Sequence, residues 1–306
     1  MPHPSPVSGP PSRVSRRALL AGAGVVAVGG VAAAVGVREG ALPGGDLLAR
    51  HLGDRVDGPV PEVAPGRLVG GSFVSRHRLG ARVGWSVAYP PGAARGGRGL
   101  PVAVVLHGKH GNHAKVFDRD YLALDRFLAA EVAAGGTPFA LVSVDGGNSY
   151  WHARASGEDA GAMVRDELLP LLARQGLRTD RVGLLGWSMG GFGALSLAGR
   201  WGPSRVAAVA AESPALFRSF ADAAPGSFDD AADLAAVTAF GRQDELTGIP
   251  VRIDCGTSDP FYDATRVYVA GFPHRPVCTF TAGAHDVGYW RSRAPAQLRF
   301  LSRAFA

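Results

Sequence analysis

The sequence lacks basic runs, although its formal net charge at pH 7 is +6. Only two of its 306 residues are lysines, and beyond the first 17 residues its arginines are scattered rather than interleaved with aromatic residues. Arg13, Arg16 and Arg17 alone account for half of the net charge. The charge pattern therefore argues against a nucleic-acid-binding protein.

The sequence also lacks a recognisable set of metal ligands. His107, His110 and His113 recur every three residues, but they lie in a stretch broken by glycines and not on one helix face. Asp118 and Asp120 follow, without a further ligand set of known spacing. We therefore expect a protein that works without a metal ion or an organic cofactor.

What the sequence does contain is enough apolar surface for a large core. Apolar residues make up 46% of the chain and charged residues 19%, a balance typical of globular proteins. The chain shows no internal repeat. Its length, once a targeting segment is subtracted, indicates one large domain.

The N-terminal region resembles a twin-arginine export signal. Arg16 and Arg17 precede an apolar run that continues to about Val37, and residues 32–34 offer a small-residue cleavage site. The run is nearly long enough to span a bilayer, so its retention as an anchor, and membrane association through it, stays open. No cysteine lies near it to carry a lipid. We expect an exported protein, secreted or associated with the cell envelope, with its signal at 1–37.

The remainder divides into a linker and a catalytic domain. Residues 38–66 are rich in glycine, proline and aspartate and predict the linker, and residues 67–306 form the domain. Apolar runs in that domain predict strands at 72–77, 83–89, 102–106, 139–144, 181–185, 206–211, 251–255 and 277–281. Helical spacing appears at 121–134, 158–174, 191–201, 260–270 and 289–305. This alternation predicts an α/β fold, with a mainly parallel sheet, helices on both faces and an antiparallel edge at its start. The segment 213–248 is long enough for a small helical cap but not for a large lid domain.

The domain is organised around Gly186-Trp187-Ser188-Met189-Gly190, between a predicted strand and a predicted helix. Strand, sharp turn and helix is the arrangement of a nucleophile elbow, in which the serine Oγ projects from the strand's carboxyl end. In a chain with 43 glycines this pattern alone is not specific. The interpretation depends on finding a base and an acid for Ser188.

The sequence offers one main candidate for the acid and two rivals. A serine hydroxyl needs a base, and the base needs an acid that orients it. Asp259 follows the strand 251–255 and can turn toward the site. Asp254, inside that strand, and Asp263, in the helix that follows, remain alternatives.

The candidate base is His285, which lies just past the strand 277–281 on a loop of small residues. The order serine, acid, histidine is that of α/β-hydrolases. The alternative is a surface or supporting histidine. An oxyanion needs two backbone N–H donors, and we assign these to Met189, after the nucleophile, and Lys109, after the strand 102–106. His107 is expected to bond backbone groups around that turn.

Five further residues are predicted to contact substrate from the loops at this end of the sheet. They are His110, Trp151, His152, Trp187 and Phe217.

From about Arg67 to its end, the chain resembles the esterase-D-like branch of the α/β-hydrolase superfamily. That branch includes S-formylglutathione hydrolases, feruloyl and siderophore esterases, and the antigen 85 mycolyltransferases. The resemblance is carried by the elbow at 186–194, by Gly283-Ala284-His285-Asp286 with Tyr289-Trp290, and by Glu167-Leu168-Leu169-Pro170. It implies the α/β-hydrolase fold and hydrolytic ester chemistry.

The resemblance does not extend to one substrate. Trp187 and Phe192 stand where S-formylglutathione hydrolases usually have histidines, and the mycolyltransferases usually lack the double glycine after Met189. The stretches 148–152 and 213–228, the expected pocket walls, contain no long apolar run. We therefore expect a serine carboxylic-ester hydrolase acting on short or medium acyl esters. The alternatives are acyl transfer to an envelope sugar or lipid, and a hydrolase-like scaffold with an inactive site.

The only two cysteines, Cys255 and Cys278, fall on the last two predicted strands. A disulfide between them and a pair of free thiols are both open. The sequence does not indicate an oligomeric state.

Overall fold

A computed structural model describes residues 56–93 and 97–306 of the chain. The expected export signal at 1–37 lies outside the described residues, as does the expected linker up to residue 55. Within the described ranges, no helix is both long and apolar enough to cross a membrane.

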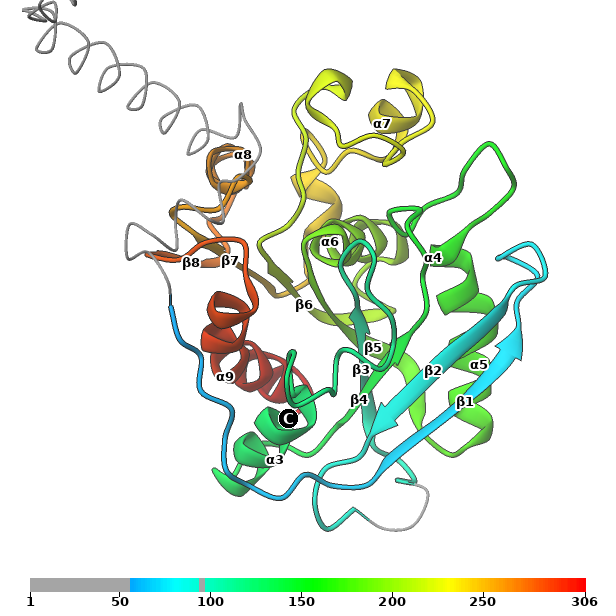
Figure 1. Cartoon of the computed structure of the whole chain (residues 1–306), viewed down its shortest axis with the longest axis vertical. Helices are drawn as coiled ribbons and strands as arrows, with labels where there is room; N and C mark the ends of the chain where they lie inside the picture. Colours follow the sequence, from blue (N-terminus) through cyan, green and yellow to red (C-terminus); the bar gives the residue numbers. More distant parts are fainter. Residues whose placement is uncertain (1–55, 94–96) are drawn as a thin grey trace, which may run out of the picture. The chain divides into compact units, whose positions relative to one another are not determined.

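An eight-stranded sheet forms the centre of the fold, in the order β1-β2-β4-β3-β5-β6-β7-β8 (Figure 1). The strands are β1 (Leu68–Val74), β2 (Arg82–Ala88), β3 (Pro101–Leu106), β4 (Ala140–Val144), β5 (Arg178–Trp187), β6 (Val206–Glu212), β7 (Val251–Gly256) and β8 (Val277–Thr281). β1 pairs antiparallel with β2, β2 also pairs antiparallel with β4, and every other pair in this sheet is parallel. The predicted fold, including its antiparallel edge, is confirmed.

Helices cover both faces of this sheet. They are α3 (Leu124–Ala133), α4 (Ala160–Met163), α5 (Leu169–Arg174), α6 (Met189–Trp201), α7 (Ala231–Val237), α8 (Tyr262–Ala270) and α9 (Val287–Ala304), with 3-10 turns at Phe220–Asp222 and Gln243–Leu246. The strand β3 is apolar throughout its sequence because both of its faces are buried. Val102, Val104 and Leu106 join the core under α4–α6 and α8, whereas Ala103 and Val105 join the core under α3 and α9. Successive side chains point to opposite faces, so a doubly covered strand needs apolar residues at every position.

The predicted helix at 158–174 is continuous but not regular. It begins at Ala160, where the Asp159 side chain accepts a hydrogen bond from the Ala162 N–H as an N-cap. Between α4 and α5, residues Val164–Leu168 form a π-helical turn, and the Leu169 N–H bonds the Val164 carbonyl five residues back. Pro170 follows at once and has no N–H to donate, so the regular α-helical ladder could not have continued through it.

The described part of the expected linker has no helix or strand and lies against the domain. Gly58 packs so closely on the start of α9 that a Cβ there would overlap the Ser292 backbone. Further along, Arg126 donates to the Val63 carbonyl over 2.8 Å.

Two carboxyl groups are buried together between the sheet and α9. Glu212 at the end of β6 lies opposite Asp254 on β7, and Gln297 of α9 donates a hydrogen bond to each. Asp254 also accepts two hydrogen bonds from the Arg252 guanidinium, at 2.7 and 2.8 Å. Burial, and after it the neighbouring Asp254 charge, raise the pKa of Glu212 well above its usual range. Burial thus favours the protonated form of Glu212, while the Arg252 guanidinium pairs with Asp254.

This arrangement predicts a specific effect of Glu212→Gln on stability. A carboxyl whose folded-state pKa is raised contributes stability below its unfolded pKa of about 4.3, and that contribution is lost as pH rises toward the folded pKa, at about 1.4 kcal/mol per pH unit. Glutamine does not titrate. The free energy of unfolding of Glu212→Gln should therefore rise relative to that of the wild type as the pH increases from 5 to 8. Denaturant unfolding at several pH values measures the difference.

The exposed Asp244→Asn serves as the matched control and should leave the pH dependence unchanged. Parallel pH profiles for the wild type and Glu212→Gln would mean that Glu212 is ionised in the folded protein.

The two cysteines are free thiols in the structure. Cys278 lies opposite Ile253, two positions before the buried Cys255 along the neighbouring strand. Burial raises the pKa of the Cys255 thiol well above its usual range, so it stays protonated and unreactive.

In denaturant without reductant, both cysteines should be alkylated, and Cys255 should resist alkylation in the native protein. Mass spectrometry reads both outcomes; an unmodified mass in the denatured sample would instead reveal a disulfide.

Candidate active site

Ser188 occupies a strained turn between β5 and α6. Its φ of 55° and ψ of −123° lie in a region that residues with side chains rarely adopt. The surrounding chain holds it there: the Ser188 N–H donates to the Glu212 carbonyl over 2.9 Å, and the Ser188 carbonyl accepts from the Ala215 N–H over 3.0 Å. Both partners belong to β6 or the loop after it, so the neighbouring strand fixes the turn.

The two glycines of the motif are required by close backbone contacts. A Cβ on Gly186 would overlap the Gly190 carbonyl, and a Cβ on Gly190 would overlap the Leu106 carbonyl at the end of β3. In a glycine-rich chain the motif alone is ambiguous. Both positions exclude any side chain, as a helix-packing turn would also require, so the interpretation of Ser188 depends on its partners.

Three predicted residues meet at the carboxyl edge of the sheet. The Ser188 Oγ lies 3.0 Å from His285 Nε2, and His285 Nδ1 lies 2.8 Å from Asp259 Oδ2. Asp259 is buried, and its other oxygen accepts from the Phe261 N–H over 2.9 Å. A histidine placed between a hydroxyl and a buried carboxylate can accept the hydroxyl proton and be stabilised as its charge develops.

The rival acids lie elsewhere. Asp254 is committed to Arg252 and Gln297 on the α9 side. Asp263 is exposed in the first turn of α8.

Two aromatic rings flank the His285 imidazole. The Trp290 ring meets it edge-on with centroids 5.0 Å apart, and the Phe261 ring meets it at 5.3 Å. Trp187 packs in turn against Trp290, at 6.2 Å. These contacts restrict the orientation of the imidazole. Sequence reasoning missed the role of Phe261, although its position two residues after Asp259 is a usable signal.

The turn after β3 lies against the nucleophile. A Cβ on Gly108 would come within 2.8 Å of Trp187 Nε1 and 3.5 Å of the Ser188 Cβ, so only glycine permits this approach. The Gly111 N–H donates to the Gly108 carbonyl over 3.0 Å and closes a turn. The Lys109 amide lies within this turn. Met189 begins α6, and the first N–H groups of a helix have no intrahelical acceptor. Both assigned oxyanion donors thus border Ser188.

His107 supports this turn, as the sequence predicted. Its Nδ1 is 2.7 Å from the Gly108 carbonyl, and its Nε2 accepts from the Gly146 N–H over 2.9 Å. Burial lowers the pKa of His107, which keeps the imidazole neutral and able to accept. Asn148 also stabilises this turn, because its Oδ1 accepts a hydrogen bond from the His110 N–H over 2.8 Å.

The three histidines after β3 do not converge. Both His107 nitrogens are occupied by backbone groups, and His113 Nδ1 is 2.7 Å from the Ser86 hydroxyl. In the described part of the chain, no group of three or more His, Cys, Asp and Glu side chains could hold a metal ion.

Four of the five predicted substrate contacts are buried side chains. Trp151 and His152 have no exposed surface, and Trp187 and Phe217 are also buried. Trp151 packs against Gly146 and Gly193 as part of the core, so its assignment to the pocket wall is wrong. Of the five, only His110 is exposed.

The other three have structural partners. His152 Nε2 bonds Asp233 over 3.1 Å, Trp187 belongs to the cluster under α9, and Phe217 packs on Phe228 and Phe261. The structure does not place these three side chains on an open wall.

The segment 213–248 forms the expected small cap, and polar contacts fasten it to the domain. Lys109 Nζ donates to the Pro225 carbonyl over 3.0 Å, and Arg154 pairs with Asp229 over 2.8 Å. The rings of Tyr150 and Phe192 in the domain pack together with those of Phe217 and Phe228 in the cap. Sequence reasoning missed these fastening contacts, because nothing in the spacing of Asp229 indicates its distant partner.

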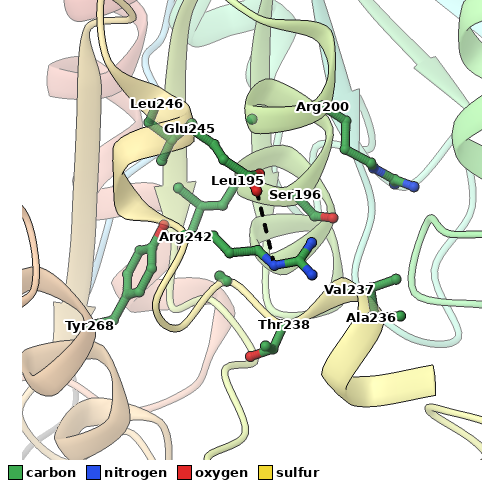
Figure 2. A pocket seen from close by; sticks show the side chains of 12 residues that line it. Leu195, Ser196, Arg200, Ala236, Val237, Thr238, Arg242, Glu245, Leu246 and Tyr268 are labelled. Atoms are coloured by element: carbon green, nitrogen blue, oxygen red, sulfur yellow. Dashed lines mark ion pairs between the residues drawn. The ribbon is translucent and has the colours of Figure 1, made fainter. Parts of the chain in front are cut away.

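A small cavity between α6 and the cap is not the substrate site. It lies between α6 and residues 236–246, and Leu195, Ser196, Arg242 and Glu245 are among its lining residues (Figure 2). None of its lining residues belongs to the Ser188–His285–Asp259 group.

Comparison with known proteins identifies the relationships of the chain. Residues 76–301 match the sequence model of the family described as "Putative esterase". A search of curated proteins finds no match. Among solved structures, a ferulic acid esterase is 22% identical and covers 79% of this chain and 100% of its own, with a TM-score of 0.63.

Two other similar structures are serine hydrolases or esterases by name. An S-formylglutathione hydrolase from Agrobacterium tumefaciens is 18% identical, with a TM-score of 0.65, covering 80% of this chain and 98% of its own. The fluorophosphonate-binding serine hydrolase F of Staphylococcus aureus is 16% identical, with a TM-score of 0.64, covering 78% of this chain and 99% of its own. At these identities the structures establish the fold, and the family match covers most of the chain. The chain therefore belongs to the Putative esterase family, in the esterase-D-like branch of the α/β-hydrolases, and is a serine carboxylic-ester hydrolase.

Proposed function

We propose that Ser188, His285 and Asp259 form the catalytic triad of an exported esterase that hydrolyses short or medium acyl esters. The observation that carries this proposal is the continuous hydrogen-bonded chain from the Ser188 Oγ through the imidazole to the buried Asp259 carboxylate. The strained elbow supports it, because a costly backbone conformation persists only where surrounding contacts impose it.

In the proposed acylation step, the Ser188 Oγ attacks the ester carbonyl while His285 Nε2 takes the hydroxyl proton. Asp259 holds Nδ1–H and stabilises the imidazolium. The carbonyl oxygen becomes an oxyanion, which the Met189 and Lys109 amides would bind. The imidazolium then gives its proton to the departing alcohol, which leaves an acyl group on Ser188.

In the second step, a water molecule takes the place of the alcohol. His285 removes a proton from that water as its oxygen attacks the acyl carbon, and the collapse of the second oxyanion returns the proton to Ser188. The free acid leaves. Because the alcohol of one step and the water of the other use the same base, the triad itself does not select hydrolysis over transfer.

The surroundings of Ser188 favour hydrolysis of modest substrates. The exposed side chains on the loops expected around Ser188, such as His110, Asn148 and Arg218, are polar. The apolar rings between the cap and the domain are packed against one another rather than along an open channel. A long acyl chain would need such a channel, so a short or medium acyl group fits better.

Export is proposed from the sequence alone. Arg16 and Arg17 before the apolar run to Val37 support a twin-arginine-type signal and a secreted or envelope-associated enzyme. Retention of the run as an anchor is the alternative.

Substitutions of the triad should separate chemistry from stability. Ser188→Ala should abolish ester hydrolysis and labelling by a fluorophosphonate probe, with the thermal unfolding temperature unchanged, because the removed hydroxyl supports no part of the core. Asp259→Asn should lower kcat by about three to four orders of magnitude through loss of imidazole orientation. Hydrolysis of a chromogenic short-chain ester measures both.

Asp263→Asn is the matched control for the acid and should retain wild-type activity. If Asp263→Asn is as damaging as Asp259→Asn, the assignment of the acid is wrong. Full activity in Ser188→Ala would refute the mechanism, and a folded wild type that resists the probe would indicate an inactive scaffold.

The fate of the acyl group is tested with competing acceptors. A short-chain ester is supplied together with trehalose or glycerol at increasing concentration, and the products are identified by mass. Free acid should remain the main product throughout, because water reaches the acyl carbon without a formed acceptor site. Acylated acceptor in excess of free acid at millimolar acceptor would identify a transferase instead.

A further inference from the structure

A second cavity lies behind the acid and the base, between α8 and the edge strand β8. Its volume is about 340 Å³, within the range of small-molecule sites. It is lined by Arg266, Val269, Ala270, Phe272, Arg275 and Phe280. α8 begins three residues after Asp259, and β8 ends four residues before His285. None of the lining residues belongs to the Ser188–His285–Asp259 group.

The floor of this cavity is apolar and continuous with the core. Val269 is buried, and Phe272 and Phe280 pack against the same core cluster. Neighbouring rings hold both phenylalanines: the Tyr268 ring meets Phe272 at 5.2 Å, and the Tyr262 ring meets Phe280 at 5.6 Å. The floor is therefore a fixed aromatic surface.

The polar groups of the cavity are two exposed arginines, Arg266 on α8 and Arg275 just before β8. The Arg266 guanidinium lies 5.5 Å from the Tyr262 ring centroid, and Arg275 Nε donates to Cys278 Sγ over 3.3 Å. Within residues 56–93 and 97–306, neither forms an ion pair with a carboxylate, whereas Arg154 and Arg252 both do. No acidic residue lines the cavity. Its charge is therefore positive and uncompensated by its own walls.

We propose that this cavity binds a small carboxylate with an apolar or aromatic body. Guanidinium groups bind carboxylates through paired, charge-assisted hydrogen bonds, and the aromatic floor would cover the apolar body and remove it from water. The positive charge selects an anion, and the volume limits it to a small one. The acids released by ester hydrolysis have this chemistry, so the site could retain product beside the catalytic elements. The binding itself is independent of the triad assignment.

Binding is tested on the full chain with octanoate as the probe, by titration calorimetry. We expect saturable binding that Arg266→Gln and Arg275→Gln each weaken by about tenfold, the loss of one charge-assisted contact. Arg303→Gln, an exposed arginine near the end of α9, is the matched control and should bind as the wild type does. Octanol, which has the same chain without the charge, should bind at least about tenfold more weakly than octanoate.

Three results would overturn the proposal. Equal affinity for octanol would mean an apolar patch without anion selection, and equal affinity for inorganic phosphate would mean a charge site without an apolar contact. Octanoate binding unaffected by either arginine substitution would place it elsewhere, for example beside Ser188. Because Ser188→Ala leaves Arg266 and Arg275 in place, that variant should still bind octanoate, and the test stands even if the proposed esterase mechanism fails.

Discussion

The hydrogen bonds between Ser188 and the end of β6 are the constraint on which the active site depends. They hold Ser188, the proposed nucleophile, in a backbone conformation of positive φ that costs on the order of 1–3 kcal/mol. This conformation brings α6 so close to β3 that Gly190 has no room for a side chain. The Gly108 turn after β3 also lies against Ser188, so the position of the proposed oxyanion donors depends on the position of the elbow. Glu212, whose backbone carbonyl accepts the Ser188 N–H, is itself buried, and burial raises the pKa of its carboxyl.

Much of this arrangement could be predicted because a covered parallel sheet requires a distinctive sequence in each of its strands. Its strands are apolar on both faces, so they stand out in the sequence, and their carboxyl ends lie along one edge. Ser188, Asp259 and His285 each follow such a strand, and the structure brings them within hydrogen-bonding distance. The helix at 158–174 was predictable as an element, but the π-helical turn before Pro170 was not, since spacing does not distinguish one helical register from another.

The surroundings of the triad were less predictable, for a reason visible at Trp151. Tyr150 and Trp151 both have positive φ, so the chain turns there in a way that their residue types do not suggest. That turn directs the Trp151 ring into the core, against Gly146 and Gly193, rather than into the pocket. Likewise, His152 and Phe217 could be placed near the site from sequence, but not on the buried side of the cap. Side-chain direction in irregular loops depends on distant contacts, such as those of Asp233 and Phe228, that local sequence does not encode.

The position of the last strand has a consequence for how activity arises during folding. Ser188 and His285 are separated by 97 residues, and in the described sheet β8, which leads into His285, is the edge strand beside β7. Contact between such distant positions requires the entropy of closing a long loop to be overcome. A chain whose other strands had assembled without β8 would have the Ser188 turn but not His285 beside it. In the proposed mechanism, hydrolysis would begin only when the C-terminal strand docks, so the appearance of activity would mark the completion of the fold.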